Sequence, residues 1–119
     1  VHEPPQGFAS NATTSRGTTA LEPGHICSNE PGFYLANEYG IRIENLILCA
    51  PHVESEYGQF LHFETLSLFP IDLNLIEQHL LTAAEVQWLN VYHERVVREL
   101  SPLLNEEELK WLLEKSRPI

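Results

Sequence analysis

Apolar residues follow a strand-like spacing in the early part of the chain and a helical spacing in the later part. Residues 41–50 first alternate apolar with polar side chains and then become continuously apolar, which is typical of a strand half-exposed at one end and buried at the other. Proline, glycine and asparagine bound shorter apolar runs at residues 25–28, 33–36 and 59–68. We therefore predict short strands joined by turns, after a loop-rich segment at residues 1–24.

Two helices are predicted after Pro70. Thr82 and Glu85 have the spacing of a capping box, and an apolar stripe follows at helical spacing. Asn105 precedes three glutamates, which suit the positive end of a second helix. The predicted fold class is α+β, with antiparallel strands in residues 1–80 followed by two packing helices in residues 81–119.

Composition narrows the class of protein. The 17 acidic and 7 basic side chains give a formal charge of −10, which disfavours nucleic acid and anionic membrane surfaces as partners. No apolar stretch approaches the roughly 20 residues that cross a bilayer, so we expect no membrane span. Only two cysteines, Cys27 and Cys49, are present, which favours a reducing compartment and hence the cytoplasm. The chain starts at Val1 without a methionine, and we expect it to be a piece of a larger protein.

Glu30 and Glu44 are the strongest candidates for chemistry. They lie symmetrically about Asn37, so a hairpin that turns there places them opposite each other, about 4.5–5.5 Å apart at Cβ. Two carboxylates at that distance repel unless a cation lies between them, and a metal ion would supply it. Because the turn sequence at residues 37–40 is centred beyond Asn37, we expect direct opposition to require a bulge. The alternative is a pair of exposed glutamates, with Arg42 forming a surface ion pair with Glu44.

Other polar residues carry weaker signals. His62 and Glu64 are two apart in a strand and share one face, which is compatible with a hydrogen-bonded pair, a metal-neighbouring pair or an ordinary polar contact. His79 and His93 are interpreted as surface or packing residues. The sequence contains no phosphate-binding glycine loop, nucleophile-elbow serine or Cys-x-x-Cys pair.

Several motifs resemble the pita-bread metallopeptidases, the family of aminopeptidase P, prolidase, creatinase and methionine aminopeptidase. In the family's order and spacing these are Val1-His2-Glu3, Leu21-Glu22-Pro23-Gly24-His25-Ile26, Asn29-Glu30-Pro31-Gly32-Phe33-Tyr34, Gly40-Ile41-Arg42-Ile43-Glu44-Asn45 and Phe63-Glu64-Thr65-Leu66. Trp88-Leu89-Asn90, Tyr92-His93 and Arg117-Pro118-Ile119 are similar to the tail of the larger aminopeptidase P form. The resemblance implies the C-terminal portion of a pita-bread fold, with residues 1–80 in the catalytic domain and residues 81–119 as a helical extension.

The resemblance implies removal of an N-terminal residue that precedes proline, by water activated between two divalent ions, usually manganese in this family. Glu30 and Glu44 match two of the metal ligands. His2 matches a histidine that contacts the substrate and assists proton transfer, and Arg42 matches an arginine near the metal carboxylates. The implied partner is a peptide with proline in second position.

The resemblance also has gaps. The family site requires two aspartates and a further histidine upstream of His2, and Pro4 replaces the usual glycine. We therefore expect an incomplete metal site that is inactive alone, within a parent enzyme. The alternative is a non-catalytic pita-bread module that binds peptides or protein partners. A further possibility is a homodimer formed through exposed sheet edges.

Overall fold

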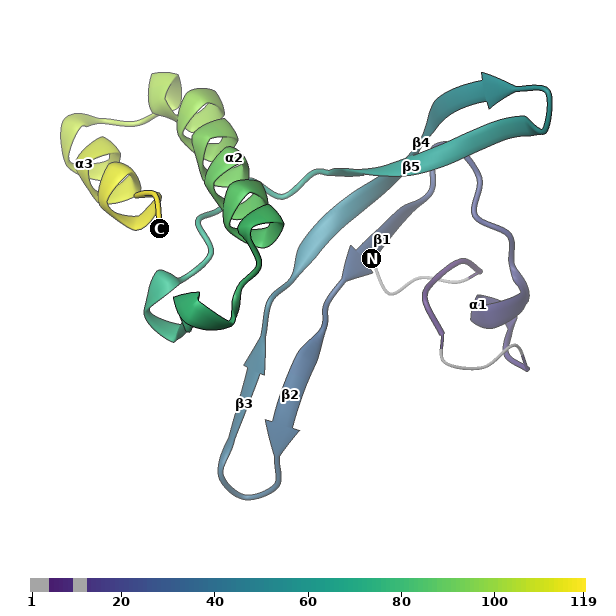
Figure 1. The fold of residues 1–119 in the computed structure, drawn as a ribbon, viewed down its shortest axis with the longest axis horizontal. Coiled ribbons are helices and arrows are strands. Elements are labelled where there is room, and N and C mark those ends of the chain that lie inside the picture. Colours follow the sequence, from purple (N-terminus) through teal and green to yellow (C-terminus); the bar gives the residue numbers. More distant parts are fainter. Residues whose placement is uncertain (1–4, 10–12) are drawn as a thin grey trace. The chain divides into compact units, whose positions relative to one another are not determined.

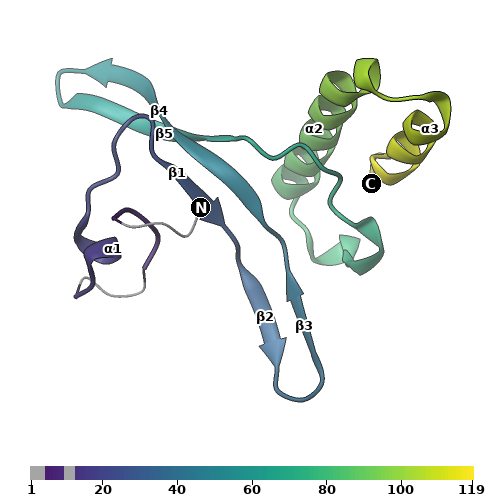
Figure 2. The ribbon, with the colours of Figure 1, turned by 180° about the vertical axis from the view of Figure 1, so that it is seen from behind.

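The chain divides into two compact units, Val1–Ser67 and Leu68–Ile119, in a computed structural model that describes residues 5–9 and 13–119. The first unit contains the strands and the short helix α1 (Ser15–Thr18), and the second contains α2 (Ala83–Leu100) and α3 (Glu106–Lys115), as Figures 1 and 2 show. The α+β class predicted from the sequence is confirmed. The boundary between residues 80 and 81 stays a prediction.

The strands of the first unit are all antiparallel. A three-stranded sheet has the order β1 (Ile26–Asn29), β4 (Asn45–Ser55) and β5 (Gly58–Thr65), and β2 (Gly32–Leu35) pairs with β3 (Tyr39–Arg42). The two sets share one register, because Asn29 lies opposite Asn45 and Gly32 lies opposite Arg42. β1 with β2, and β3 with β4, therefore form the two arms of one long hairpin (Figure 1).

The long hairpin turns at Asn37. Leu35 lies opposite Tyr39, and the Glu38 amide donates to the Leu35 carbonyl at 3.1 Å. Asn37 has a φ of 61°, in the left-handed region that asparagine tolerates better than most residues. The expectation that a bulge is needed here is wrong, because the turn is centred on Asn37 itself.

The strand predicted at residues 41–50 is divided between β3 and β4. The ladder is interrupted between Arg42 and Asn45, where the opposite arm carries Pro31. Pro31 has no N–H to donate, although its carbonyl accepts from the Ile43 amide at 3.2 Å. The missing N–H of Pro31 therefore interrupts the ladder. The run that the apolar pattern predicted as one strand is divided into β3 and β4.

β4 extends further than the sequence predicted. Residues 51–55 lie beyond the apolar run at 41–50, yet they continue the pairing with β5. A shift of register between Pro51 and Val53 accommodates the proline, which a regular ladder excludes. The actual connection is a tight turn that ends at Gly58, whose φ is 119°.

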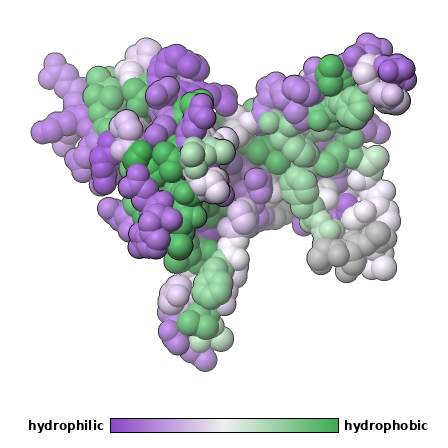
Figure 3. Space-filling model, viewed as in Figure 1, coloured by the Kyte–Doolittle hydropathy of each residue, from purple (hydrophilic) through white to green (hydrophobic). Residues whose placement is uncertain are grey.

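The buried part of the first unit is small. Cys27, Ile47 and Cys49 are at most 6% exposed. The later part of the apolar run, which was predicted to be buried, buries alternate side chains, because Leu46, Leu48 and Ala50 are only half-buried. Many large apolar side chains of the sheet and the hairpin are exposed, Phe33 and Phe60 among them. Figure 3 accordingly shows apolar residues, in green, at the surface of this unit.

Capping boxes start both long helices of the second unit. Thr82 Oγ1 accepts from the Glu85 amide at 3.3 Å, and the Glu85 carboxylate accepts from the Thr82 amide at 2.8 Å. Asn105 and Glu108 form the same pair of contacts at 3.0 and 2.9 Å. Both predicted helix starts are confirmed. Short 3-10 turns precede and join the helices at Leu73–Leu75, Gln78–Leu80 and Ser101–Leu103.

The helices pack around Tyr92, Val96 and Leu112, each at most 5% exposed. His93 is buried beside them, and its Nε2 accepts from the Ile71 amide at 3.0 Å, which confirms its interpretation as a packing residue. No helix in the described part of the chain has the length and apolarity to cross a membrane.

Candidate metal centre

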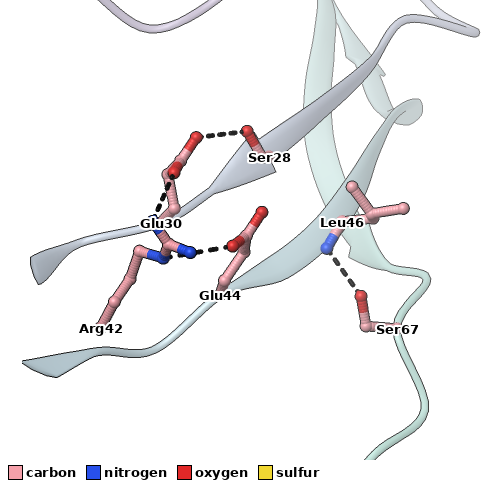
Figure 4. Close-up of polar contacts among 6 residues, drawn as sticks. All are labelled: Ser28, Glu30, Arg42, Glu44, Leu46 and Ser67. Carbon is pink, nitrogen blue, oxygen red and sulfur yellow. Dashed lines mark hydrogen bonds and ion pairs between the residues drawn. The ribbon is translucent and has the colours of Figure 1, made fainter. Parts of the chain in front are cut away.

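The two candidate glutamates lie where the sheet passes into the hairpin. Glu30 follows β1 and Glu44 precedes β4, and the register on both sides of this point places them opposite each other. Figure 4 shows their carboxylates extending into the same region from the two neighbouring arms. Both side chains are partly accessible, at 33% and 36% exposed. The backbone therefore produces the opposition that the sequence spacing predicted.

Arg42 lies between the two carboxylates. Its Nε is 3.3 Å from Glu44 Oε2, and its Nη1 is 3.8 Å from Glu30 Oε2. The guanidinium thus offsets the repulsion between the glutamates. The surface ion pair between Arg42 and Glu44, which was the alternative expected from the sequence, is present and also includes Glu30. The arginine side chain is 50% exposed, so water screens the attraction and its contribution to stability is small.

Tyr34 is a neighbour of Arg42 on the hairpin. A hydrogen bond with the Tyr34 side chain, followed by the charge of Glu44, raises the pKa of the Arg42 guanidinium above its usual range. The tyrosine ring lies across the hairpin, since a Cβ at Gly40 would be 2.6 Å from Tyr34 Cδ1, and a Cβ at Gly32 would be 2.6 Å from the hydroxyl oxygen. The two glycines therefore leave the space that the ring occupies.

Ser28 contacts Glu30 and Ser67 contacts the start of β4, and the sequence reasoning missed both serines. Ser28 Oγ donates to Glu30 Oε1 at 2.8 Å, and Ser67 Oγ accepts from the Leu46 amide at 2.8 Å (Figure 4). The available signal for Ser28 is its place two residues before Glu30, because alternate residues of a strand share a face. Ser67 has no such signal, since its contact joins residues 21 apart in the sequence.

A hollow of about 320 Å³ adjoins Glu30. It is lined by Gln6, Gly7, Phe8, Arg16, Cys27, Ser28, Asn29, Glu30 and Pro31. Burial is the main reason that the pKa of the Cys27 thiol in its wall is raised. Because the thiolate is the metal-binding form, Cys27 is a poor ligand at neutral pH, and Glu30 is the lining residue best suited to a hard ion.

The remaining candidates from the sequence have different positions. His62 Nε2 is 3.4 Å from Glu64 Oε1 on β5, and its ring stacks on His52 with 4.9 Å between centroids. His62 and Glu64 therefore form the predicted pair on one face of β5, and their contacts indicate no further role. His2 lies outside the described residues, so its position stays a prediction.

The donor set fits part of a divalent-ion site. Carboxylate oxygens are hard ligands that suit manganese and similar ions, and Glu30 and Glu44 present them from opposite arms. Across residues 5–9 and 13–119, no group of three or more histidine, cysteine, aspartate or glutamate side chains could hold a metal ion. The two glutamates by themselves would supply only part of the ligands of such a site.

Comparison with known protein families covers almost the entire chain. Residues 1–51 match metallopeptidase family M24, and residues 59–119 match the C-terminal region of peptidase M24. The chain belongs to the M24 family. Glu30, Arg42 and Glu44 fall in the first matched segment of this M24 chain, and helices α2 and α3 fall in the second.

The M24 chain is similar to Xaa-Pro aminopeptidases along its whole length. It is 40% identical to a probable Xaa-Pro aminopeptidase P of Coprinopsis cinerea and 39% identical to both the Xaa-Pro aminopeptidase app-1 of Caenorhabditis elegans and aminopeptidase P2 of Arabidopsis thaliana. Each comparison covers all of this chain but only 17% to 20% of the length of the relative. The chain thus spans about a fifth of the length of these relatives.

A solved structure supports the same assignment. The crystal structure of X-prolyl aminopeptidase from Caenorhabditis elegans matches 83% of this M24 chain and 17% of its own, at 40% identity and a TM-score of 0.75. That protein is described as a cytosolic enzyme with a di-nuclear active site. The predicted fold, the C-terminal portion of a pita-bread domain, is confirmed by this match.

Proposed function

We propose that this chain is the C-terminal part of a metal-dependent aminopeptidase that removes an N-terminal residue preceding proline. The observation that carries the proposal is the pair of opposed carboxylates, Glu30 and Glu44, in a chain 40% identical to an Xaa-Pro aminopeptidase relative. The di-nuclear site of the structural relative supports two divalent ions in the complete enzyme, and we assign these as manganese. The chain contributes only part of that site and is proposed to be inactive alone.

Each residue of the centre has a defined task in this proposal. Glu30 and Glu44 supply carboxylate ligands from opposite arms of the hairpin. When bound, a pair of divalent ions lowers the pKa of water and stabilises the developing oxyanion. Arg42 contacts both carboxylates, so it orients them and offsets their negative charge. His2 is assigned to substrate contact and proton transfer near neutral pH.

The proposed substrate is a peptide with proline in second position, as the names of the relatives suggest. The proposed site of action is the cytoplasm, which is supported by the cytosolic description of the Caenorhabditis elegans relative. Homodimer formation stays a prediction.

Substitution of Glu44 tests the proposal in the full-length protein. Glu44→Ala removes a metal ligand, so cleavage of an Xaa-Pro peptide is expected to fall by more than the roughly 10–100-fold typical of groups that only support a ligand. Release of the N-terminal residue is measured with and without manganese. Glu54→Ala, which removes an exposed glutamate further along β4, is the matched control and is expected to retain activity.

Two results would redirect the assignment. Cleavage by Glu44→Ala at the wild-type rate contradicts the role of this carboxylate. Binding of the Xaa-Pro peptide by the wild-type protein, without cleavage at any manganese concentration, favours the non-catalytic peptide-binding module instead.

A further inference from the structure

The two carboxylates of the candidate metal centre are held in different ways. Glu30 Oε1 accepts a hydrogen bond from Ser28 Oγ at 2.8 Å, while its Oε2 lies 3.8 Å from the Arg42 guanidinium. Glu44 is held through its Oε2, which is 3.3 Å from Arg42 Nε. Figure 4 shows Ser28 on the side of Glu30 that faces away from Arg42. Each oxygen of Glu30 therefore has its own neighbour.

The backbone makes the contact of Ser28 with Glu30 available. Ser28 lies within β1 two residues before Glu30, so the two side chains share a face. Ser28 is also paired with Leu46 of β4, and the Leu46 amide is held in turn by Ser67 Oγ. Ser28 is partly buried, which limits the competition of water for its hydroxyl. Its position is thus fixed by the sheet and not by the glutamate.

We propose that Ser28 is a positioning residue for Glu30. Its hydroxyl donates a hydrogen bond to Oε1 of Glu30 and thereby sets the orientation in which Oε2 is directed toward Arg42 and Glu44. The proposal rests on the function proposed above, in which Glu30 is a metal ligand. A carboxylate that is already oriented loses less side-chain freedom when an ion binds, and partners that orient ligands sustain metal affinity for this reason. Ser28 itself contacts neither the ion nor the substrate in this role.

Titration of the metal-free, full-length protein with Mn²⁺ tests the role of Ser28. Ser28→Ala is expected to weaken Mn²⁺ binding by about 10–100-fold in calorimetry, the range found when a ligand loses its supporting partner. Ser28→Thr retains a hydroxyl on Cβ and is expected to restore the affinity. At saturating Mn²⁺, the KM for an Xaa-Pro peptide is expected to stay at the wild-type value in both variants.

Ser55→Ala is the matched control for the loss of a serine hydroxyl. Ser55 lies at the far end of β4, where its Oγ accepts from the Tyr57 amide at 3.2 Å. Its substitution is expected to leave Mn²⁺ affinity unchanged. The midpoint temperature of thermal unfolding, measured without metal, is expected to be the same for Ser28→Ala and Ser55→Ala, which separates positioning of Glu30 from a general effect on folding.

The outcomes distinguish the role of Ser28 from the proposed function. Wild-type Mn²⁺ affinity in Ser28→Ala overturns the positioning role, and so does an equal loss of affinity in Ser28→Thr. Glu30→Ala provides the reference: if it binds Mn²⁺ as the wild type does, Glu30 is not a ligand and the proposed function fails. Weak binding by Glu30→Ala together with wild-type binding by Ser28→Ala overturns the role of Ser28 alone.

Discussion

His93 connects helix α2 to the segment that precedes the helices. The side chain is 1% exposed, and its Nε2 accepts from the Ile71 amide at 3.0 Å, so this nitrogen carries no proton. Nδ1 therefore carries the proton of the neutral ring, and it makes no well-formed hydrogen bond within the described residues. Burial lowers the pKa of His93, and the nearby Arg117 backbone opposes the shift. Protonation would remove the acceptor for Ile71 and place a charge in the core.

The stability of the helical unit is expected to decrease as the pH falls below about 6.5, the ordinary pKa of histidine. The unfolded chain binds a proton there while the folded chain resists it, so the free energy of unfolding falls until the lowered pKa of the folded state is passed. Urea unfolding at pH 5 and pH 7.5 measures the difference. His93→Gln retains an acceptor without a titrating group and is expected to reduce the difference, whereas an unchanged pH dependence would exclude His93 as its source.

At the scale of elements, sequence spacing predicted the hairpin that positions the centre but not the side chains that complete it. The symmetry about Asn37 was sufficient to place Glu30 opposite Glu44. The interruption at Pro31 was not predicted, since an apolar pattern does not register one missing N–H donor. Tyr34 was not identified as a partner of Arg42, because its effect depends on where the ring lies over Gly32 of its own arm and Gly40 of the opposite arm.

Gly40→Ala is expected to destabilise the hairpin by about 1–3 kcal/mol, the usual cost of forcing extra volume against a packed side chain. The new methyl group would lie 2.6 Å from Tyr34 Cδ1, so the ring must move and the contact of Tyr34 with Arg42 is expected to weaken. Chemical denaturation measures the loss of stability. The same substitution made in a Tyr34→Ala background is expected to cost much less, and an equal cost in both backgrounds would show that the ring is not the obstacle.

At the scale of the whole molecule, the chain has two cores of different kinds. The first unit buries Cys27, Ile47 and Cys49 in a sheet whose other apolar side chains are largely exposed, and the second buries Tyr92, Val96 and Leu112 among its helices. The family matches divide the chain at a different place, between residues 51 and 59, so that most of β5 falls in the second match although it belongs to the first unit. The chain spans about a fifth of the length of these relatives, and much of the apolar surface of its first unit is exposed.

The two units are expected to unfold as separate transitions in the 119-residue chain, and its own residues supply the probes. Both tryptophans, Trp88 and Trp111, lie in the second unit, and both cysteines lie buried in the first. Thr82→Ala removes a helix cap that contributes about 1 kcal/mol, so it is expected to lower the urea midpoint of tryptophan fluorescence and leave the midpoint of thiol reactivity unchanged. Thr14→Ala, which removes the cap of α1 in the first unit, is expected to leave the fluorescence midpoint unchanged. Equal shifts of both signals in Thr82→Ala would instead show one cooperative transition and contradict separate unfolding of the two units.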